Sequence, residues 1–257
     1  MVKPIKAFIK DKLEVLIFDS REQMGQAAYE AYQDKVISKL SKQDEVRAVF
    51  AAAHSQDDFL MCLSQDRSID FRKIVAFHMD EYIGLPENAP QKFGTFLKKA
   101  IFSKVPFKSV NYIQSGSSTI QDECARYSRL LHERPLDIVS MGIGENGHIA
   151  FNDPAEAHFY EKNWIKETRL DAICRQQQVN DGEFLHFEDV PQTAFTLTIP
   201  ALMSCEQVIC IVPTARKAEA VYKMLQEPVS EMCPASILRM HDHAKLFLDK
   251  EAANKII

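Results

Sequence analysis

Short apolar runs of strand length alternate along this chain with longer segments whose apolar residues recur at helical spacing. The runs that predict strands span residues 14–18, 46–52, 74–79, 110–113, 136–141, 208–212 and 245–248. Helices are predicted after Ser20, which is placed to cap the first of them, and over residues 55–62, 93–100, 119–131 and 214–224. Because parallel strands require long crossover connections, this alternation predicts an α/β fold. We expect a single three-layer domain with a mostly parallel, Rossmann-like sheet and helices on both faces.

The predicted domain spans residues 1–257, a length usual for one α/β domain. Residues 155–190 are more polar and less periodic than the rest, which predicts an irregular excursion over the carboxyl end of the sheet and not a second domain. In a parallel sheet, ligands bind beyond the carboxyl ends of the strands. The site is therefore expected among residues 51–56, 77–86, 141–154 and 212–217.

The charge of the chain disfavours nucleic acids and acidic membrane surfaces as partners. Lys+Arg 31 against Asp+Glu 36 leaves a formal net charge of −5, and no basic run is longer than a pair. The first twenty residues hold no uninterrupted apolar segment, and no run reaches membrane-spanning length, so a cytoplasmic location is expected. The six cysteines lack metal-binding spacing, and His241-Asp242-His243 offers too few ligands, so no metal site is predicted.

Three of the eight glycines, Gly142, Gly144 and Gly147, fall within six residues after the fifth predicted strand. Their spacing is that of the dinucleotide fingerprint GxGxxG, which needs a helix to open directly after it. Two turn-forming residues and Pro154 follow instead, which disfavours a nucleotide site. The favoured alternative is a loop that brings its backbone close to a small ligand.

The same loop carries polar side chains suited to acid–base chemistry, among them Asn146, His148 and Asp153. A carboxylate five positions after a histidine can hold the imidazole in one tautomer and raise its basicity. His148 is therefore a candidate general acid or base near neutral pH.

A second cluster of carboxylates, Asp80 and Glu81, ends the third predicted strand before Gly84 and Pro86 turn the chain away. Glu81 is equally compatible with a solvated loop position. Asp80 lies where a side chain faces the mouth of the cleft, and partial burial there would raise its pKa toward that of a useful proton acceptor.

Two further strand ends have features of phosphate sites. In residues 51–56, small residues precede Ser55, which is able to cap a helix whose backbone N–H groups and dipole attract an anion. At the other end, Thr214 is placed to cap a helix whose first turn contains Arg216 and Lys217. Cations are unfavourable at that end of a helix unless an anion lies nearby, so the pair indicates a phosphate.

Three strings, HMDEYIGLP at 78–86, GIGENGHIAFNDP at 142–154 and PTARKAEAV at 213–221, resemble the glucosamine-6-phosphate deaminase/isomerase family. That family shares a superfamily with 6-phosphogluconolactonases and sugar-phosphate-sensing transcription factors. The resemblance implies conversion of glucosamine 6-phosphate and water to fructose 6-phosphate and ammonia, without metal or organic cofactor. The implied partner is a small phosphorylated amino sugar.

The resemblance also implies roles for individual residues. His148 matches the residue that opens the pyranose ring, Asp80 the carboxylate that moves a proton between C2 and C1, and Lys217 a lysine that binds the 6-phosphate. Where the family usually has aspartate and glutamate, this chain has Asn146 and Asp153, which are expected to orient His148. The remaining residues expected at the substrate are Ala52, Ala53, Ser55, Gln56, Glu81, Gly144, Gly147 and Arg175.

Two alternatives remain open at this level. A lactonase of the same superfamily would have an aspartate directly before the Gly-His pair, where this chain has Asn146. A non-catalytic sugar-phosphate sensor usually lacks the acid–base residues, whereas Asp80 and His148 are both present. Relatives occur as monomers and as larger assemblies, so a homo-oligomer is compatible with the sequence.

Overall fold

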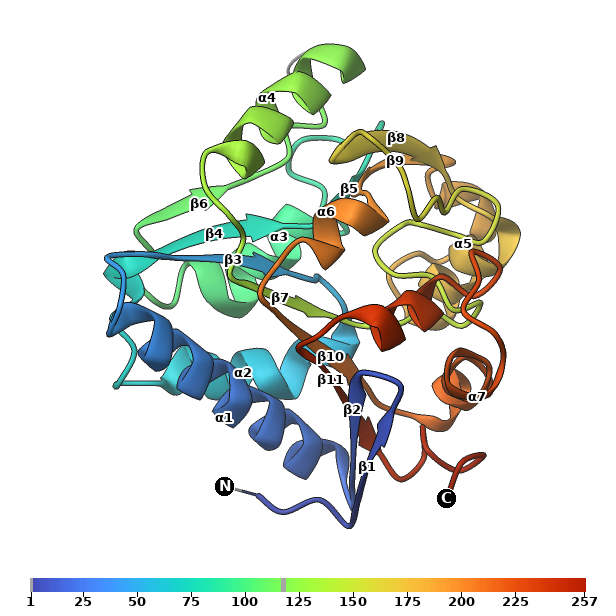
Figure 1. Ribbon diagram of the computed structural model, residues 1–257. Helices are drawn as coiled ribbons and strands as arrows, with labels where there is room; N and C mark the ends of the chain where they lie inside the picture. The colour runs from blue at the N-terminus through green and yellow to red at the C-terminus, as the bar shows by residue number, and fades with distance from the viewer. Residues whose placement is uncertain (1, 117–118) are drawn as a thin grey trace.

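The computed structural model describes residues 2–116 and 119–257, which form a large central sheet and a small second sheet (Figure 1). The central sheet has eight strands in the order β1-β2-β11-β10-β7-β3-β4-β6. In chain order they are β1 (Lys6–Lys10), β2 (Leu13–Phe18), β3 (Val46–Phe50), β4 (Ile74–His78), β6 (Ser109–Asn111), β7 (Ile138–Met141), β10 (Gln207–Val212) and β11 (Ala244–Asp249). All neighbours pair in parallel except β1 and β2, so the mostly parallel α/β fold is confirmed.

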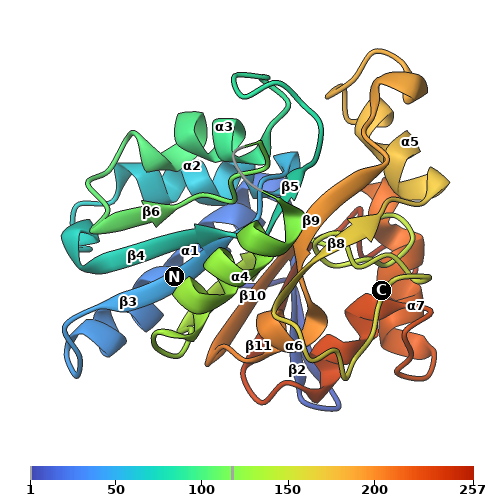
Figure 2. The same ribbon diagram turned by 90° about the horizontal axis from the view of Figure 1, so that it is seen from above.

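Helices cover both faces of this sheet (Figure 2). One face packs on α1 (Arg21–Leu40), α2 (Asp57–Gln65) and α3 (Phe93–Leu97), and the other on α4 (Ile120–His132), α6 (Ile199–Met203) and α7 (Ala218–Gln226). Along β2, Val15 and Ile17 belong to one hydrophobic cluster and Phe18 to the other, as the period of two in a strand requires. Burial on both faces explains why these strands are nearly continuous apolar runs.

The second sheet has the order β5-β9-β8 and is antiparallel, with β5 (Asp80–Tyr82), β8 (Ile165–Arg169) and β9 (Thr193–Leu197). It stands at the carboxyl end of the central sheet together with α5 (Ala172–Asn180). The excursion over residues 155–190 thus differs from the irregular segment that was expected, since it contains β8 and α5. Their half-polar sequences hide the pattern, because each buries only one side.

Several short 3₁₀ turns and one π turn connect these elements: η1 (His54–Gln56), η2 (Phe71–Lys73), η3 (Lys98–Phe102, the π turn), η4 (Phe187–Asp189), η5 (Ala215–Lys217) and η6 (Pro234–Met240). Ser20 caps α1 as expected, with its hydroxyl accepting from the backbone N–H of Gln23 over 3.3 Å. The expected caps at Ser55 and Thr214 are wrong. Ser55 lies inside η1, and Thr214 precedes η5 with a backbone φ of 77° and no side-chain cap.

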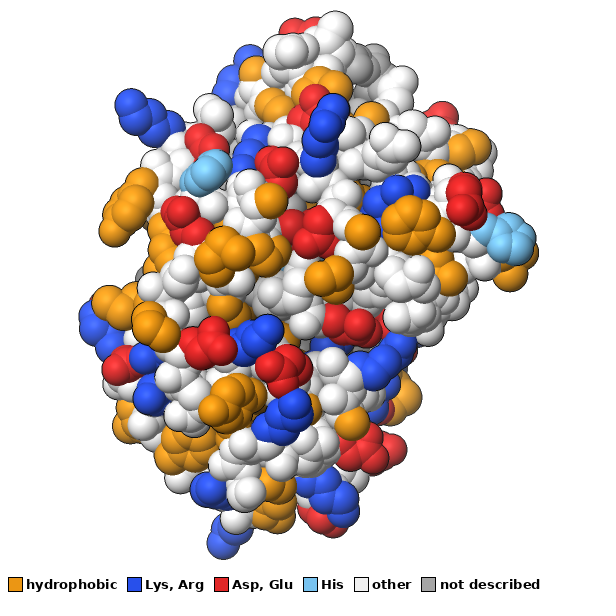
Figure 3. All heavy atoms as spheres, turned by 90° about the vertical axis from the view of Figure 1, so that its right-hand side faces the viewer, with side chains coloured by type: hydrophobic (Ala, Val, Ile, Leu, Met, Phe, Trp, Pro, Cys, Tyr) orange, Lys and Arg blue, Asp and Glu red, His pale blue; other side chains and the backbone are white. Residues whose placement is uncertain are grey.

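Acidic and basic side chains are interspersed on the face shown in Figure 3, which is the right-hand side of Figure 1. No basic belt of the kind that binds nucleic acid stands out there. Within the described ranges, no helix combines the length and apolarity needed to cross a membrane.

Candidate active site

A pocket of about 900 Å³, counting its open mouth, lies at the carboxyl ends of β3, β7 and β10 and beside β5. Asp80, His148 and Lys217 all line it, although they come from three distant parts of the sequence. From the expected phosphate loop, Ala52, Ala53 and Ser55 line it as well, together with Gly144. The strand-end rule therefore brings together the groups expected to carry chemistry and the groups expected to bind phosphate.

Asp80 opens β5, directly beyond the end of β4, and its backbone pairs with Thr196 of β9. The residue is 7% exposed, and its carboxyl has no hydrogen-bond partner among the described residues. Burial, with a smaller effect from the neighbouring Glu81 carboxylate, raises the pKa of Asp80 well above its usual range. A carboxyl group in this state can both accept and return a proton near neutral pH.

His78, two residues earlier, fixes the end of β4. Its Nε2 accepts from the backbone N–H of Ile113 over 2.8 Å, and its own carbonyl accepts from the Tyr127 hydroxyl over 2.8 Å. Burial lowers the pKa of His78 to about 3, so the ring stays neutral. Asp80 is thus presented to the pocket by a rigid strand end.

Glu81 points away from the pocket. Its carboxylate accepts from the backbone N–H groups of Tyr82, Phe93 and Gly94 over 3.0–3.1 Å. It ties β5 to the start of α3, and the structure gives no support to the expectation that it contacts substrate.

The glycine-rich loop after β7 makes a tight turn in which Gly144 N–H donates to the carbonyl of His148 over 2.9 Å. No helix opens after Gly147. Residues 148–154 instead form turns and a short bridge between Ile149 and Asn152, so the dinucleotide alternative is wrong. Gly147 has a φ of +85° and does not line the pocket.

The imidazole of His148 lies flat against Gly144. A Cβ at residue 144 would stand 2.1 Å from Cε1 of the ring, so only glycine leaves room for this orientation. Gly144 therefore contributes to the site by leaving space for the ring of His148.

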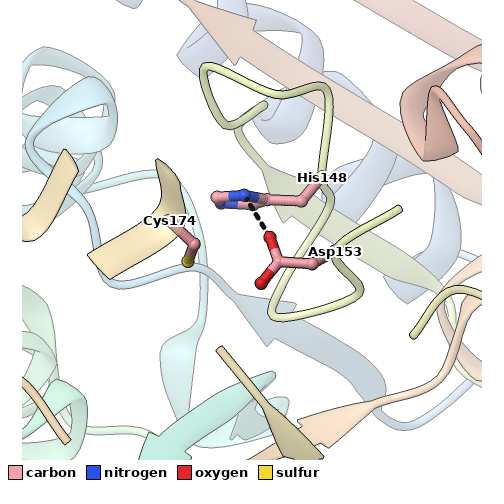
Figure 4. A group of neighbouring side chains, drawn as sticks. All are labelled: His148, Asp153 and Cys174. Carbon is pink, nitrogen blue, oxygen red and sulfur yellow. Dashed lines mark ion pairs between the residues drawn. The ribbon is translucent and has the colours of Figure 1, made fainter. Parts of the chain in front are cut away.

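Asn146 and Asp153 hold the loop around His148, and Figure 4 shows Asp153 beside the ring. Nδ1 of His148 is 3.0 Å from Oδ1 of Asp153, and the backbone N–H of His148 donates to Oδ1 of Asn146 over 3.0 Å. The Asn146 amide donates to Asp153 and to Asp171, both over 2.8 Å.

Burial alone would raise the pKa of Asp153, but three groups outweigh it and hold that pKa below its ordinary value. These are the imidazole of His148, the amide of Asn146 and the backbone N–H of Asp171. Asp153 therefore stays ionised beside His148, although its carboxylate lies 3.0 Å from Nδ1 without making the expected orienting hydrogen bond.

The phosphate end of the pocket is built from η1 and η5. Gln56 is buried, and its amide donates to the Ser55 hydroxyl over 2.9 Å and to the Met141 carbonyl over 3.2 Å. It shapes the loop from behind, and Ser55 faces the pocket beside Gly142, where a Cβ would stand 2.8 Å from the Ser55 hydroxyl.

Lys217 has a buried Nζ without a hydrogen-bond partner in the part of the chain that the structure describes. Burial lowers the pKa of Lys217, with nearby carboxylates opposing that shift only in part. An unpaired buried cation at a pocket wall is unfavourable by itself and points to an anionic ligand. Next to it, the strained φ of Thr214 is held by two hydrogen bonds from its N–H to the Asp249 carboxylate, over 3.0 and 3.1 Å.

Arg175 does not reach the pocket, contrary to expectation. Its guanidinium carbon lies 4.1 Å from the ring centroid of Phe187, and its nitrogens donate to the carbonyls of Phe187 and Val190 over 2.8 Å. It braces the turn after α5 instead of facing the site.

The sequence reasoning missed several lining residues, of which Gln177 and Gln178 of α5 are both nearly buried. Gln177 accepts from the backbone N–H of Glu145 over 3.0 Å. The turn after α5 also contacts η1, since Glu183 lies 3.1 Å from His54. The run of consecutive glutamines was the sequence feature that could have indicated them. Glutamine side chains are mostly exposed, so buried ones usually have a specific hydrogen-bonding role.

Known proteins resemble this chain in sequence and in fold. The family described as "Glucosamine-6-phosphate isomerases/6-phosphogluconolactonase" matches residues 19–248. The chain is 31% identical over 241 residues to a glucosamine-6-phosphate deaminase of Bacillus cereus (strain B4264), covering 93% of this chain and 88% of that protein. A glucosamine-6-phosphate deaminase of Bacillus thuringiensis (strain Al Hakam) is 30% identical with the same coverage.

Among solved structures, one of a monomeric glucosamine-6-phosphate deaminase superposes with a TM-score of 0.84 at 26% identity, covering 93% of this chain and 98% of that one. A 6-phosphogluconolactonase from Thermotoga maritima gives a TM-score of 0.76 at 20% identity, covering 93% and 100%. The second likeness concerns the fold alone.

Proposed function

The chain belongs to the glucosamine-6-phosphate isomerase/6-phosphogluconolactonase family, and on that premise we propose that it converts glucosamine 6-phosphate and water to fructose 6-phosphate and ammonia. The observation that carries this proposal is the presence of Asp80, His148 and Lys217 on the wall of one pocket. A proton acceptor, an oriented imidazole and an unpaired cation are what an amino-sugar phosphate requires.

In this mechanism the 6-phosphate binds between η1 and Lys217, where its charge compensates the buried ammonium. His148, whose ring is held against Gly144, transfers the proton that opens the sugar ring. Asp80 removes the proton from C2 and returns it to C1, and water replaces the amino group at C2 as ammonia leaves. Burial suits Asp80 to this task because a carboxyl group with a raised pKa is a stronger base toward a carbon acid.

The same pocket is less suited to lactone hydrolysis. That reaction needs one general base to activate a water, a role that Asp80 or His148 alone would fill, so it does not require both groups on one wall as deamination does. Of the relatives at 30% identity or more reported above, both are named deaminases.

The test is to incubate the purified protein with glucosamine 6-phosphate and, separately, with 6-phosphogluconolactone. We expect ammonia and fructose 6-phosphate from the first substrate, with a kcat that falls by about 10²–10⁴ in Asp80→Asn while binding persists. Glu87→Gln, which removes an exposed carboxylate outside the pocket lining, serves as the control. Lactone hydrolysis without ammonia release would favour the lactonase, and binding without turnover would favour the sensor.

A further inference from the structure

Three potential metal ligands of different kinds meet at the inner wall of the pocket: His148, Asp153 and Cys174 (Figure 4). One ligand atom from each, a ring nitrogen, a carboxylate oxygen and the thiol sulfur, lie within 4.8 Å of one another. The first two residues come from the loop after β7 and the third from α5. Asp153 and Cys174 are fully buried, and His148 is 7% exposed where it lines the pocket.

Two of these atoms lack the hydrogen bonds that buried polar groups normally have. His148 Nδ1 is 3.0 Å from the Asp153 carboxylate, yet it makes no hydrogen bond. Figure 4 shows why, since the carboxylate lies against the flat side of the ring and not in line with its in-plane nitrogen. Among the described residues, the thiol of Cys174 also has no hydrogen-bond partner, although it points toward the same carboxylate.

We propose that His148, Asp153 and Cys174 form a binding site for a thiophilic divalent cation of the Zn²⁺ type. Imidazole nitrogen, carboxylate oxygen and thiolate sulfur are the ligands that Zn²⁺ takes, at bond lengths of about 2.0–2.3 Å. Neighbouring ligands of a tetrahedral ion then lie roughly 3.3–3.7 Å apart, so the widest separation must close by about 1 Å. Rotation of the unpaired thiol about its Cα–Cβ bond provides such a movement.

The charges around the cluster favour a cation on balance. The Asp171 carboxylate adds a further negative charge near Cys174. The ammonium of Lys217, at the phosphate end of the pocket, adds a positive charge that partly cancels it. On binding, the thiol proton passes to the buffer and the sulfur donates to the ion as a thiolate. Three protein ligands leave a fourth position for a water or another ligand, as in zinc sites that exchange ligands.

The site has a consequence for the reaction that rests on the proposed function. An ion held by His148 occupies the imidazole that transfers the proton in ring opening. The cation and the sugar phosphate are therefore expected to compete, and the ion acts as an inhibitor and not as a cofactor. Cys174 has no part in the proposed chemistry, so its removal separates inhibition from turnover.

The direct test is titration of the metal-free protein with Co²⁺, followed by near-ultraviolet absorption. We expect a thiolate-to-cobalt charge-transfer band in the wild type that is absent in Cys174→Ser. Cys62→Ser is the matched control, because Cys62 is half-buried on α2 and its thiol donates to Gln26. The band should persist in that variant. A band that survives in Cys174→Ser, or none in the wild type, overturns the proposal.

Zn²⁺ affinity, measured by competition with a chromophoric chelator, tests the other two ligands. Loss of a residue that only hydrogen-bonds a metal ligand already weakens metal binding by about tenfold or more. Loss of a ligand itself should cost at least as much, so we expect Zn²⁺ affinity to fall more than about tenfold in His148→Gln and in Asp153→Asn. Unchanged affinity in both variants contradicts the site. These readouts need no substrate, so they stand or fall independently of the deaminase activity.

Inhibition is the final readout. Cys174→Ser and Cys174→Ala should retain turnover and lose sensitivity to micromolar Zn²⁺, with melting temperatures recorded to confirm that both variants are folded. Equal Zn²⁺ inhibition of the wild type and both Cys174 variants would place the inhibitory ion elsewhere and refute the competition.

Discussion

The side-chain amide of Asn146 donates a hydrogen bond to the carboxylate of Asp153 over 2.8 Å. The second proton of the same amide reaches Asp171, also over 2.8 Å. Asn146 thus separates two carboxylates that would otherwise face each other, and an acid at this position would be the third in one cluster. The chain carries Asp171 at the N-cap of α5, and this is the physical reason for an amide at residue 146.

We expect Asn146→Asp to lower kcat. The substitution removes two donors and brings a third negative charge to a partly buried cluster, which raises the pKa of Asp153 from its present lowered value. Asp153 then loses its charge at a higher pH, so the acidic limb of the activity profile should move upward. The measurement is kcat against pH with glucosamine 6-phosphate.

The double variant Asn146→Asp/Asp171→Asn distinguishes this cause from a general loss of structure. The asparagine introduced at position 171 can still cap α5, and its amide can donate to the carboxylate introduced at position 146, which restores one of the two lost contacts. Partial recovery of kcat is the expected result. Two losses that simply add would argue against electrostatic coupling between the two positions.

Gly144→Ala should inactivate the enzyme with little loss of fold. The new Cβ would stand 2.1 Å from the His148 ring, and the ring must rotate out of the pocket to avoid it. A reactive group displaced by about 1 Å can lose a hundredfold in rate. We expect kcat to fall by about that factor while circular dichroism is unchanged.

Gly116→Ala is the control for Gly144→Ala, since a Cβ there has no neighbour within 4 Å among the residues that the structure describes and the backbone has no positive φ. That variant should keep the activity of the wild type. Full activity of Gly144→Ala would show that His148 does not need its present orientation.

Much of this site could be predicted from the sequence, because strands that are buried on both faces form nearly continuous apolar runs. All seven apolar runs became strands of the central sheet, and Asp80, His148 and Lys217 follow three of them at its carboxyl edge. The edge strand β1 was missed, since its exposed alternation of lysine and apolar residues resembles a loop. The β5-β9-β8 sheet was missed because its partners are distant in sequence and half-polar.

The direction in which individual side chains point could not be predicted from the sequence. Arg175 lies one residue after Cys174, yet one faces the carbonyls of Phe187 and Val190 and the other points toward Asp153. The direction depends on how the turn after α5 packs, which no local pattern encodes. Glu81 is similar, because its bonds to Phe93 and Gly94 depend on where α3 begins.

Lys217→Met should stabilise the fold while weakening substrate binding. The wild-type ammonium is buried without a partner, and a buried unsatisfied group costs about 1–3 kcal/mol. Because burial lowers the pKa of Lys217, this penalty is fully present below its folded-state pKa and fades as the pH rises toward the ordinary lysine value. The gain in unfolding free energy and the rise in KM should therefore both be largest where Lys217 is charged and shrink at alkaline pH.

Urea unfolding at neutral and alkaline pH, together with KM, checks the Lys217 prediction. Lys223→Met is the control from the following helix. Lys223 is exposed, and its ion pair with Glu219 is long, at 3.8 Å. It should change neither quantity by much, since exposed ion pairs contribute little. A Lys217→Met protein that is less stable than the wild type would mean that Lys217 has a compensating partner.

The contact between His54 and Glu183 should make the opening of the turn after α5 depend on pH. Nε2 of His54 is 3.1 Å from Glu183, and Nδ1 is 2.9 Å from Asp57. Burial acts to lower the pKa of His54, but Asp57 and Glu183 outweigh it and raise that pKa above 6.5, whereas burial raises the pKa of Glu183. Both groups are charged only between these two values. The attraction is therefore lost as the pH rises through the His54 pKa or falls through that of Glu183.

Hydrogen exchange of α5 and the following turn, corrected for the intrinsic pH dependence, measures this opening. Because the pair is partly exposed, protection should fall by less than about fivefold above the His54 pKa. Glu183→Gln should remove the pH dependence, and Arg216→Gln, which breaks the 2.8 Å pair with Asp181, should lower protection equally on both sides of that pKa. The same pH dependence in Glu183→Gln as in the wild type would assign the effect to another titrating group.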